Sequence, residues 1–598
     1  MLKKLEKSHY LTVLVVIIIT LIAACNSEFT MSSYRTDILL TEPFLQLPTE
    51  KTIRVVWFTE FPGKKNFVIY GEGLKKSTPA KTTKLSRTQE DQNSKVGNQI
   101  KDGQVYKKPT SRNIWRHEAI IDGLISGTRI PYKVITTRED GKVINSDSYT
   151  LTPTPKAGAP LNILLTSDHQ LKPMVPANIQ KVSETIGQVD AIFLAGDAVN
   201  TSDRASEWFD DNRGGAFFPS LQGRANYELG IMDNGKTTYK GGKLIQYAPL
   251  FTAIGNHEVM GRISKKKSLN EEYEDTKPRF YAEQKYKELN RLNQLDKSPN
   301  SNFRQQWIKD NSFNTDTYEE IFTLPQSQEG KEKYYAVTFG DIRLVVLYAA
   351  NMWRSPSLDS SSKGKYREQK EDFNKPDNWG YGQHIYESIS KGSTQYKWLE
   401  KELSSQEFKK AKYKIVMLHN PPHSIGENIV PAFTNPIQII ERDKTGNIQT
   451  LRYEYPKKAD YLIRDVIPLL EKARVQLVFY GHSHIWNRFM SKNGMHFLES
   501  SNVGNSYGAF IKDKQRPTPI NYKESYAKVG DPNGLEAIAP TIAPLTAASD
   551  GQPLPYIALN DITIFSIFNT KTGIVSSYRF DGRNPSSTVV KFDEFKLK

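Results

Sequence analysis

Apolar runs that end abruptly in polar, metal-binding side chains constrain this chain more than any other feature of its sequence. The clearest is the run 475–480, which ends in Gly481-His482-Ser483-His484. Because residues two apart in an extended segment point to the same side, His482 and His484 can both face one point just beyond a strand. We expect Gly481 to let the backbone turn there without steric cost. Two converging imidazoles indicate a metal site, although a surface pair of histidines would give the same local pattern.

Four other apolar runs have the same construction. Residues 161–167 end at Asp168, 190–195 at Gly196-Asp197, 249–254 at Gly255-Asn256-His257-Glu258, and 413–418 at His419. A segment with helical character, 177–186, lies between the first two runs. Near-continuous apolar strands that alternate with helices predict an α/β domain whose sheet is covered on both faces. In such sheets ligands bind beyond the carboxyl ends of the strands, where each of these polar side chains would lie.

Histidine is concentrated at these predicted strand ends. The chain has ten histidines, and six of them lie there: His169, His257, His419, His423, His482 and His484. Histidines that are scattered over a surface or buried for packing would not gather in this way. We therefore predict that the strand ends build one metal cluster, with Asp168, Asp197 and Asn256 as oxygen donors.

This mixture of donors suits the hydrolysis of phosphate esters. Two divalent ions about 3.5–4 Å apart can clamp the attacking and leaving oxygens of a phosphoryl displacement. Asp197 suits a carboxylate that bridges the ions, whereas neutral imidazole and amide ligands add no negative charge that would repel a phosphate. A hydroxide held between the ions would attack phosphorus, and His257 would protonate the leaving oxygen or stabilise the transition state.

The order of the motifs leads to a family. TSDHQ, GDAVN, GNHE, the lone His419 and GHSH, spread over 161–505, resemble the calcineurin-like metallophosphoesterase superfamily. The resemblance implies a four-layer α/β sandwich, a centre with two divalent metal ions and phosphoric ester hydrolase activity. It also implies how the ligands divide: Asn256, His419 and His482 bind one ion, Asp168 and His484 bind the other, and Asp197 is shared.

The region before these strands has an all-β pattern. Runs rich in β-branched and aromatic residues predict short strands at 52–59, 66–70, 117–121 and 130–136, with an exposed polar loop over 75–108. We expect a β-sandwich domain over 42–152, a linker over 153–160, a catalytic domain over 161–585 and a tail over 586–598. The string 117–134 resembles a signature of fibronectin-type-III-like sandwiches, and a sandwich followed by this catalytic domain resembles purple acid phosphatases.

The first metal site departs from the patterns that these resemblances imply. Most of the superfamily has Asp-x-His at the first motif, but Gln170 takes the histidine position here. Purple acid phosphatases have a tyrosine three residues after the bridging Asp, where this chain has Asn200. Gln170, Asn200 or His169 could complete the site, while His423 would support a ligand or face the substrate. Without a phenolate we expect no purple absorption band, and Mn²⁺ or Mg²⁺ suits amide ligands, with Fe and Zn as further candidates.

The N-terminus predicts export and a lipid anchor. Lys3, Lys4 and Lys7 precede an apolar stretch, 11–24, that is shorter than the ~20 residues needed to span a bilayer and fits a signal peptide. Cys25, the only cysteine, ends the string LIAAC, which resembles the bacterial lipobox. We predict a lipoprotein signal peptide over 1–25 and a tether over 26–41, with an uncleaved anchor as the alternative. The protein would be lipid-anchored at the cell envelope, at the outer membrane or the periplasmic face in a Gram-negative host.

Composition leaves the substrate open. The net charge of +15 favours anionic partners, but a solvated lysine-rich surface accounts for it equally well. Long polar insertions follow the strand ends and are expected to rim the site: 201–243, 264–311, 354–391 and 424–458. We expect hydrolysis of phosphate monoesters of the acid-phosphatase type. The alternatives are a phosphodiesterase acting on nucleotides or phospholipid head groups and a non-catalytic binding module with a degenerate first site. No sequence feature identifies a nucleic-acid groove or a protein partner.

Overall fold

The computed structural model describes residues 38–97, 106–231, 235–292, 294–295, 301–354, 364–427, 429–519, 522–584 and 586–598. The predicted signal peptide, with Cys25, and the tether up to residue 37 lie outside these ranges. Within them, no helix has both the length and the apolar character that crossing a membrane requires. Both predicted domains belong to one unit of the chain, Leu39–Lys598.

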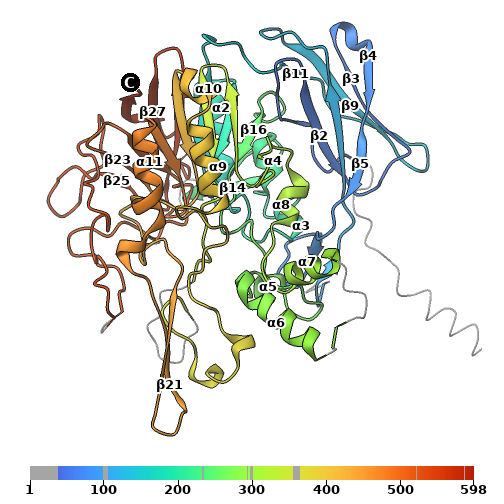
Figure 1. The fold of residues 1–598 in the computed structure, drawn as a ribbon. Coiled ribbons are helices and arrows are strands. Elements are labelled where there is room, and N and C mark those ends of the chain that lie inside the picture. The colour runs from blue at the N-terminus through green and yellow to red at the C-terminus, as the bar shows by residue number, and fades with distance from the viewer. Residues whose placement is uncertain are drawn as a thin grey trace, which may run out of the picture. The chain divides into compact units, whose positions relative to one another are not determined.

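Two antiparallel sheets form the N-terminal domain, as the sequence pattern predicted (Figure 1). Their strand orders are β1-β2-β8-β5 and β10-β9-β3-β4, and β11 pairs with β9. The sheets share one core, in which Trp57, Val68 and Tyr132 are fully buried. The strands are β1 (Phe44–Gln46), β2 (Ile53–Thr59), β3 (Lys65–Tyr70), β4 (Lys76–Pro79), β5 (Lys81–Lys84), β8 (Trp115–Ile121), β9 (Ile130–Thr137), β10 (Val143–Asn145) and β11 (Tyr149–Leu151).

The prediction of an exposed loop over 75–108 was wrong for its first half. This segment contains β4, β5 and the short strand β6 (Gln89–Glu90), which pairs with β7 (Thr110–Ser111). β4 and β5 lie at sheet edges, and most of their side chains are exposed. Their polar residues therefore need no buried face, and no hydrophobic period marked them as strands.

Two further sheets pack face to face in the second domain. The six-stranded sheet has the order β16-β13-β12-β26-β27-β28, and the seven-stranded sheet has the order β17-β18-β19-β22-β24-β23-β25. Strands β12, β13 and β16 run parallel in the first sheet, as do β18, β19, β22 and β24 in the second. The bounds are β12 (Asn162–Thr166), β13 (Ala191–Leu194), β16 (Leu250–Thr252), β17 (Tyr335–Phe339), β18 (Ile342–Val346), β19 (Tyr413–Met417), β22 (Leu477–Tyr480), β23 (Trp486–Met490), β24 (His496–Ser500), β25 (Tyr556–Ile557), β26 (Ile562–Asn569), β27 (Ile574–Asp581) and β28 (Val590–Lys596).

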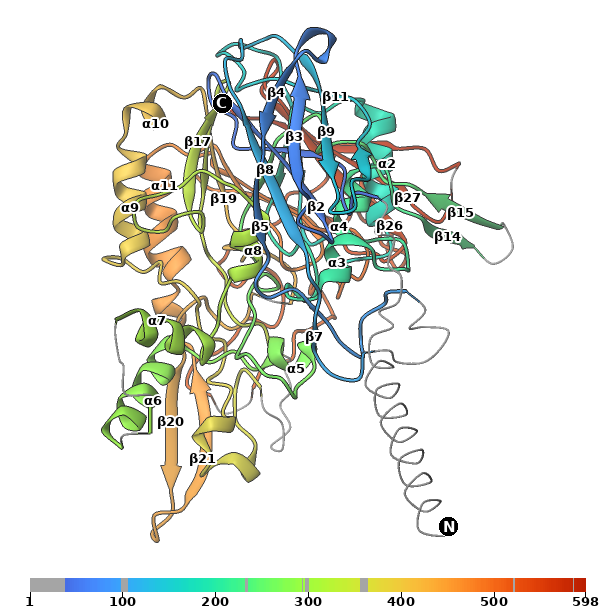
Figure 2. The same cartoon turned by 90° about the vertical axis from the view of Figure 1, so that its right-hand side faces the viewer.

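Successive residues of a strand face different cores, which explains why the predicted runs are almost continuously apolar. In β22, Leu477 and Phe479 belong to the core between the sheets, whereas Val478 belongs to a second core beneath helices. Helices α9 (Thr394–Leu403), α10 (Gln406–Lys410) and α11 (Ile467–Lys472) cover that outer face (Figures 1 and 2). Helix α2 (Val175–Ile186), close to the predicted 177–186, packs on the six-stranded sheet. The result is the four-layer α/β sandwich that was predicted.

The insertions between these strands have structure of their own. They contain α3 (Ala205–Phe209), α4 (Phe217–Leu221), the hairpin β14 (Tyr227–Ile231) and β15 (Gly235–Tyr239), α5 (Leu269–Glu274), α6 (Arg279–Arg291), α7 (Ser301–Asp310) and α8 (Asp316–Ile321). The hairpin of β20 (Ile437–Arg442) and β21 (Ile448–Glu454) projects away from the sheets (Figure 2). Buried aromatic residues, among them Tyr281 and Tyr453, pack α6 against this hairpin.

The C-terminal residues are part of the sheet rather than a tail. β28 pairs with β27 along its length, so the boundary predicted at 585 leaves out one strand. Phe592, Asp593 and Phe595 are buried, while Lys591 and Glu594 are exposed. The register between β27 and β28 shifts between Ser577 and Tyr578, which marks a bulge. Because Phe592 and Asp593 are buried in succession and four of the seven residues are charged, β28 lacks the alternation of apolar and polar residues that predicts a strand.

Candidate metal centre

The carboxyl ends of the parallel strands from both sheets meet at one place. Asp168 follows β12 and Asp197 follows β13, while His482 and His484 follow β22 of the other sheet. The backbone N–H of His482 donates to Oδ2 of Asp168 at 2.9 Å, which ties the two sheets together there. All four residues have a positive φ, between 54° and 81°. Such backbone strain in non-glycine residues is characteristic of functional sites.

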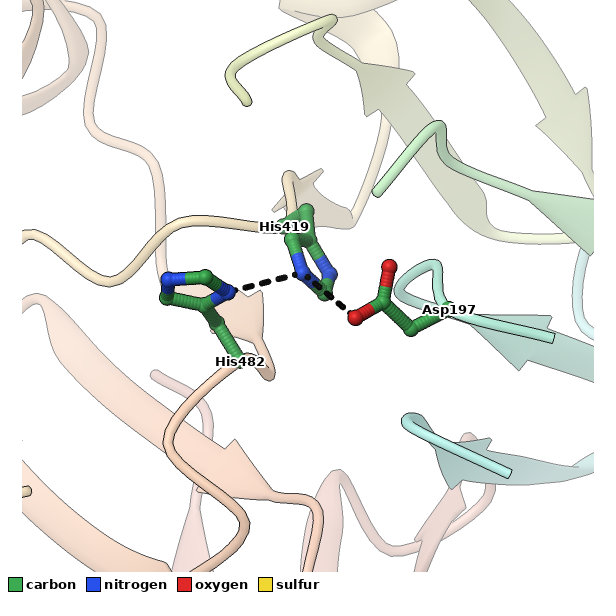
Figure 3. A group of neighbouring side chains, drawn as sticks. All are labelled: Asp197, His419 and His482. Carbon is green, nitrogen blue, oxygen red and sulfur yellow. Dashed lines mark hydrogen bonds and ion pairs between the residues drawn. The ribbon is translucent and has the colours of Figure 1, made fainter. Parts of the chain in front are cut away.

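Asp197, His419 and His482 form a compact group of buried metal-binding side chains (Figure 3). Their ligand atoms all lie within 4.8 Å of one another. Nε2 of His419 lies 3.3 Å from Oδ2 of Asp197 and 3.1 Å from Nδ1 of His482. Oδ1 of Asn256 lies 3.1 Å from the same Nε2 atom. The structure therefore brings together the residues that the resemblance assigned to one ion.

Asp168 and His484 make a second pair next to this group. Nε2 of His484 lies 3.4 Å from Oδ1 of Asp168, whose side chain is fully buried. Nε2 of Gln170 donates to Oδ2 of Asp197 at 2.9 Å, and its Oε1 atom is buried without a hydrogen-bond partner among the described residues. Gln170 thus reaches the centre with a neutral oxygen available, as one of the alternatives for the first site predicted.

The orientation of the histidine rings fits cations at this centre. Nδ1 of His419 lies 2.8 Å from the carbonyl oxygen of Ala195, and Nδ1 of His484 lies 3.0 Å from that of Asn505. Because a carbonyl oxygen only accepts, Nδ1 is the donor in each of these two rings. When such a ring is neutral, Nε2 has a lone pair, and this lone pair points towards the carboxylate of Asp197 or Asp168. Burial lowers the pKa of His419, but the carboxylates of Asp197 and Asp168 outweigh it and raise the pKa to about 10. The buried carboxylates thus favour a positive charge at this place. Divalent ions would supply it in place of the proton on Nε2 of His419.

His257 lies beside this group in a pocket of about 580 Å³. Its backbone N–H donates to Oδ1 of Asp197 at 2.9 Å, and its Nδ1 lies 2.7 Å from the carbonyl oxygen of Asn200. The ring stacks on that of Tyr273, with centroids 4.9 Å apart and planes inclined by 11°. Nε2 is the remaining polar atom of the ring, 3.5 Å from the hydroxyl of Tyr273. The ring is therefore held in one orientation beside the predicted ligands.

Three of the further candidate residues do not contribute a ligand atom to the group. His169 bonds through Nε2 to Thr166 at 3.0 Å and packs on Phe217. His423 pairs with Asp531 at 2.7 Å and packs on Phe497, away from the pocket lining. The side chain of Asn200 donates to the carbonyl of Gln170 at 2.7 Å, so Asn200 supports Gln170 and His257 from behind.

Two buried glutamates hold the site together and were not among the predicted residues. Glu258 accepts from the backbone N–H groups of Asp197, Ala198 and Gly255 at 2.7–2.8 Å. Burial, followed by the charge of Asp197, raises the pKa of Glu258 to about 7. Glu499 accepts from the N–H of Ser483 at 2.8 Å. Glu258 lies in the quoted GNHE motif, so its position was a usable signal, whereas nothing local distinguished Glu499.

The prediction that Gly481 makes the turn after β22 was wrong. Gly481 does not have a positive φ, and the turn is made by His482 and His484 themselves. A Cβ atom at position 481 would overlap with Oγ of Ser167 and Oδ2 of Asp168. Glycine is required because the two sheets approach closely at this point.

The four-layer fold and this donor set together define a metallophosphoesterase. In agreement, the profile of the family described as calcineurin-like phosphoesterase matches residues 161–486. The chain belongs to this family of metal-dependent phosphoesterases, and Asp197, His419 and His482 form its candidate buried metal site.

Two solved structures are similar to the chain at low identity. One is purple acid phosphatase PPD1 from yellow lupin (Lupinus luteus) seeds, with 15% identity, a TM-score of 0.49, and coverage of 93% of this chain and 74% of the other. The other is GAP50, the anchor in the inner membrane complex of Plasmodium, with 11% identity, a TM-score of 0.31, and coverage of 73% and 90%. No curated protein matches.

Proposed function

We propose that this protein hydrolyses phosphate monoesters with two divalent metal ions. The observation that carries the proposal is the convergence of six potential ligands from both sheets: Asp168, Asp197, Asn256, His419, His482 and His484. A binding module would not need this number of buried donors around one carboxylate. The calcineurin-like family typically binds two metal ions, which agrees with a donor set larger than one ion needs.

In this proposal Asn256, His419 and His482 would hold one ion, Asp168 and His484 would hold the other, and Asp197 would be shared between them. Bound divalent ions activate water and neutralise the charge of a phosphate group. The chain itself fixes its ligands through hydrogen bonds at their far side, as between Nδ1 of His419 and the carbonyl of Ala195. The amide oxygen of Gln170 would be the remaining donor for the ion at Asp168 and His484, and hard ions such as Mn²⁺ or Mg²⁺ accept such a ligand.

His257 is the proposed catalytic group that is not a ligand. Its Nδ1 is held by the carbonyl of Asn200, so Nε2 is the atom that can exchange a proton with a substrate. Stacking on Tyr273 keeps the ring from turning. Placed beside Asp197 in the pocket, the protonated ring would donate the proton of Nε2 to the leaving oxygen as the P–O bond breaks and would be left neutral, with its remaining proton on Nδ1.

Hydrolysis assays of a matched pair of esters test this proposal. The protein from residue 26 onwards would be supplied with Mn²⁺, Mg²⁺, Zn²⁺ or Fe in turn and given 4-nitrophenyl phosphate and bis(4-nitrophenyl) phosphate. An Asp197→Asn, His482→Ala double variant is the blank. Faster hydrolysis of the monoester supports the proposal, and faster hydrolysis of the diester supports the phosphodiesterase alternative. Rates equal to the blank with every metal would favour the non-catalytic binding module.

We further propose that the protein is exported and anchored by a lipid on Cys25. The support is the basic, apolar and LIAAC sequence of its first residues. Labelling of cells with a radioactive fatty acid tests it, with Cys25→Ser as the control. Label in the membrane fraction for the natural sequence, and none for the variant, is the expected result. Equal labelling of both would contradict lipidation at Cys25.

A further inference from the structure

A loop of the N-terminal sandwich forms part of the wall of the active-site pocket. Asn93 and Lys95, which lie between β6 and β7, line the pocket together with His257, His482 and Lys172. The sandwich was expected as a separate domain, and its sheets lie before the linker. The pocket is therefore built by both domains, and this loop is the sandwich's contribution to it.

Buried contacts fix this loop on both sides of Asn93. The carboxylate of Asp91, fully buried, accepts from Nη2 of Arg204 at 3.1 and 3.3 Å and from the backbone N–H of Leu269 at 2.7 Å. The carbonyl oxygen of Lys95 accepts from the N–H of Asn212 at 2.8 Å. A loop held at both points presents Lys95 at a defined position on the pocket wall.

The same arginine also supports the catalytic region. Nη1 of Arg204 lies 2.7 Å from Oε1 of Glu207, and Oε2 of Glu207 accepts from the N–H groups of Asn200 and Thr201 at 2.7 and 2.9 Å. The carbonyl of Asn200 in turn holds Nδ1 of His257. A continuous set of buried and partly buried polar contacts thus leads from the sandwich loop to the proposed catalytic histidine. This linkage argues that the loop belongs to the working site.

Two lysines in this wall make no close contact with a carboxylate of the described residues. In the described part of the chain, the ammonium groups of Lys95 and Lys172 form no hydrogen bond and no ion pair. Arg204 and Arg213, which line the same pocket, are paired with Glu207 and Asp211. An uncompensated cation in a concave, partly desolvated surface attracts an anion more strongly than one in open solvent.

The two lysines come from different domains, Lys95 from the sandwich and Lys172 from the segment that follows β12. Burial lowers the pKa of Lys172, and the negative charges of Asp168 and Asp197 act against this by raising it. Burial also lowers the pKa of His257, and the positive charge of Lys172 lowers it further. Lys172 is therefore near the place where the phosphoryl group that is cleaved would bind. Lys95 belongs to the loop between β6 and β7 and lines the pocket from the sandwich domain. It remains available for a negative group elsewhere on the substrate.

We propose that Lys95 binds a second phosphoryl group, so that the preferred substrates are phosphate monoesters that carry two phosphoryl groups. This inference rests on the proposed phosphomonoesterase function. One group is hydrolysed at the metal centre, and the other is held by the ammonium of Lys95, with Asn93 beside it as a hydrogen-bond donor. The sandwich domain then acts as a specificity element of the enzyme.

A pair of substrates that differ in one phosphoryl group tests the inference. We would compare kcat/KM for fructose 1,6-bisphosphate and fructose 6-phosphate by the release of inorganic phosphate, with the metal-loaded protein. We expect a preference of about tenfold for the bisphosphate, the size of one charge-assisted hydrogen bond. Lys95→Met should reduce the preference to about twofold or less, and Lys95→Arg should restore most of it. Lys81→Met removes an exposed lysine of β5 in the same domain and should keep the full preference.

The outcomes separate this inference from the proposed function. Equal kcat/KM for both sugars, or an unchanged preference in Lys95→Met with a native melting temperature, would overturn the role of Lys95 and leave the phosphomonoesterase standing. No hydrolysis of either sugar or of 4-nitrophenyl phosphate would count against the proposed function. In that case calorimetric titration with fructose 1,6-bisphosphate still tests the role of Lys95. Weaker binding in Lys95→Met would support the subsite, and unchanged binding would contradict it.

Discussion

Nε2 of His419 lies 3.1 Å from Nδ1 of His482, although the two residues are 63 positions apart in the sequence. They follow β19 and β22, which are neighbouring parallel strands. Backbone pairing continues past both strands, since the N–H of Gly481 donates to the carbonyl of His419 at 3.2 Å. The register of the sheet therefore sets the separation of the two residues that carry these imidazoles.

Removal of either imidazole should abolish metal-dependent activity. Since loss of a group that merely supports a metal ligand costs about 10–100-fold in affinity or activity, we expect His482→Ala or His419→Ala to cost at least about 100-fold. Metal content measured by mass spectrometry and phosphate release would report the loss. His496→Ala, at a histidine of β24 outside the pocket lining, is the control. Equal metal content in His482→Ala and the natural protein would exclude His482 as a ligand.

A methyl group at Gly255 should disturb the site without unfolding the protein. A Cβ atom there would overlap with Oδ1 and the backbone nitrogen of Asp197, and φ of Gly255 is not positive. We expect Gly255→Ala to lower metal affinity at least tenfold, because the carboxylate of Asp197 must move. Gly446→Ala, at an exposed turn with φ +89°, is a control that strains the backbone far from the site. Metal affinity lowered equally in both variants would show that the effect at Gly255 is not local.

Glu258 should act as a positioning residue. Its two oxygens accept from three backbone N–H groups, and Glu258→Gln would place an amide NH₂ against one or two of those donors. Leaving buried donors unsatisfied costs about 1–3 kcal/mol each. We expect a lower melting temperature and a fall in kcat that exceeds the change in KM, because the loop that carries Asp197 shifts. Glu283→Gln on the exposed face of α6 is the matched control. Wild-type kcat in Glu258→Gln would refute the positioning role.

His117 should make the sandwich domain sensitive to acid. It is fully buried between the hydroxyls of Thr59 and Thr82, at 2.7 and 2.9 Å, and burial, with a smaller effect of Arg116, lowers its pKa to about 3. The folded state therefore favours the neutral ring, while the unfolded chain takes up a proton near pH 6.5. The contribution of His117 is complete above pH 6.5 and declines by about 1.4 kcal/mol per pH unit as the pH falls towards 3.

Unfolding measured at pH 7, 5.5 and 4.5 tests this role of His117. His117→Gln keeps hydrogen-bonding groups between the threonines but cannot be protonated. We expect the variant to be less stable than the natural protein at pH 7 and to lose less stability on acidification. Parallel pH dependences for the two proteins would contradict the assignment.

Local sequence signals predicted the buried framework better than its edges. The runs that became β12, β13, β19 and β22 are covered on both faces, so nearly all of their residues are apolar and the signal is strong. The edge strands β4 and β28 bury only some of their side chains, and their many polar residues gave no hydrophobic pattern that predicts a strand. The sequence therefore specified the α/β class and the sandwich, but not where the last strand ends.

In the candidate site, too, some residues could be predicted from the local sequence and others could not. Residues directly after a strand, such as Asp168 and His419, could be placed because strand ends share one edge of a sheet. His169 could not be placed, because the direction of its ring depends on the positive φ of Asp168 before it. Lys95 could not be placed either, since it reaches the pocket through packing between domains that leaves no local pattern.

The most direct test of the central claim is a metal titration of the metal-free protein. Mn²⁺ would be added in known equivalents, and bound metal and the hydrolysis of 4-nitrophenyl phosphate would be followed together. The account predicts two equivalents bound per chain, with hydrolysis rising as the second is taken up and absent from the Asp197→Asn, His482→Ala variant. Hydrolysis that is complete at one equivalent, or that is equal in the variant, would contradict a two-metal centre built on Asp197.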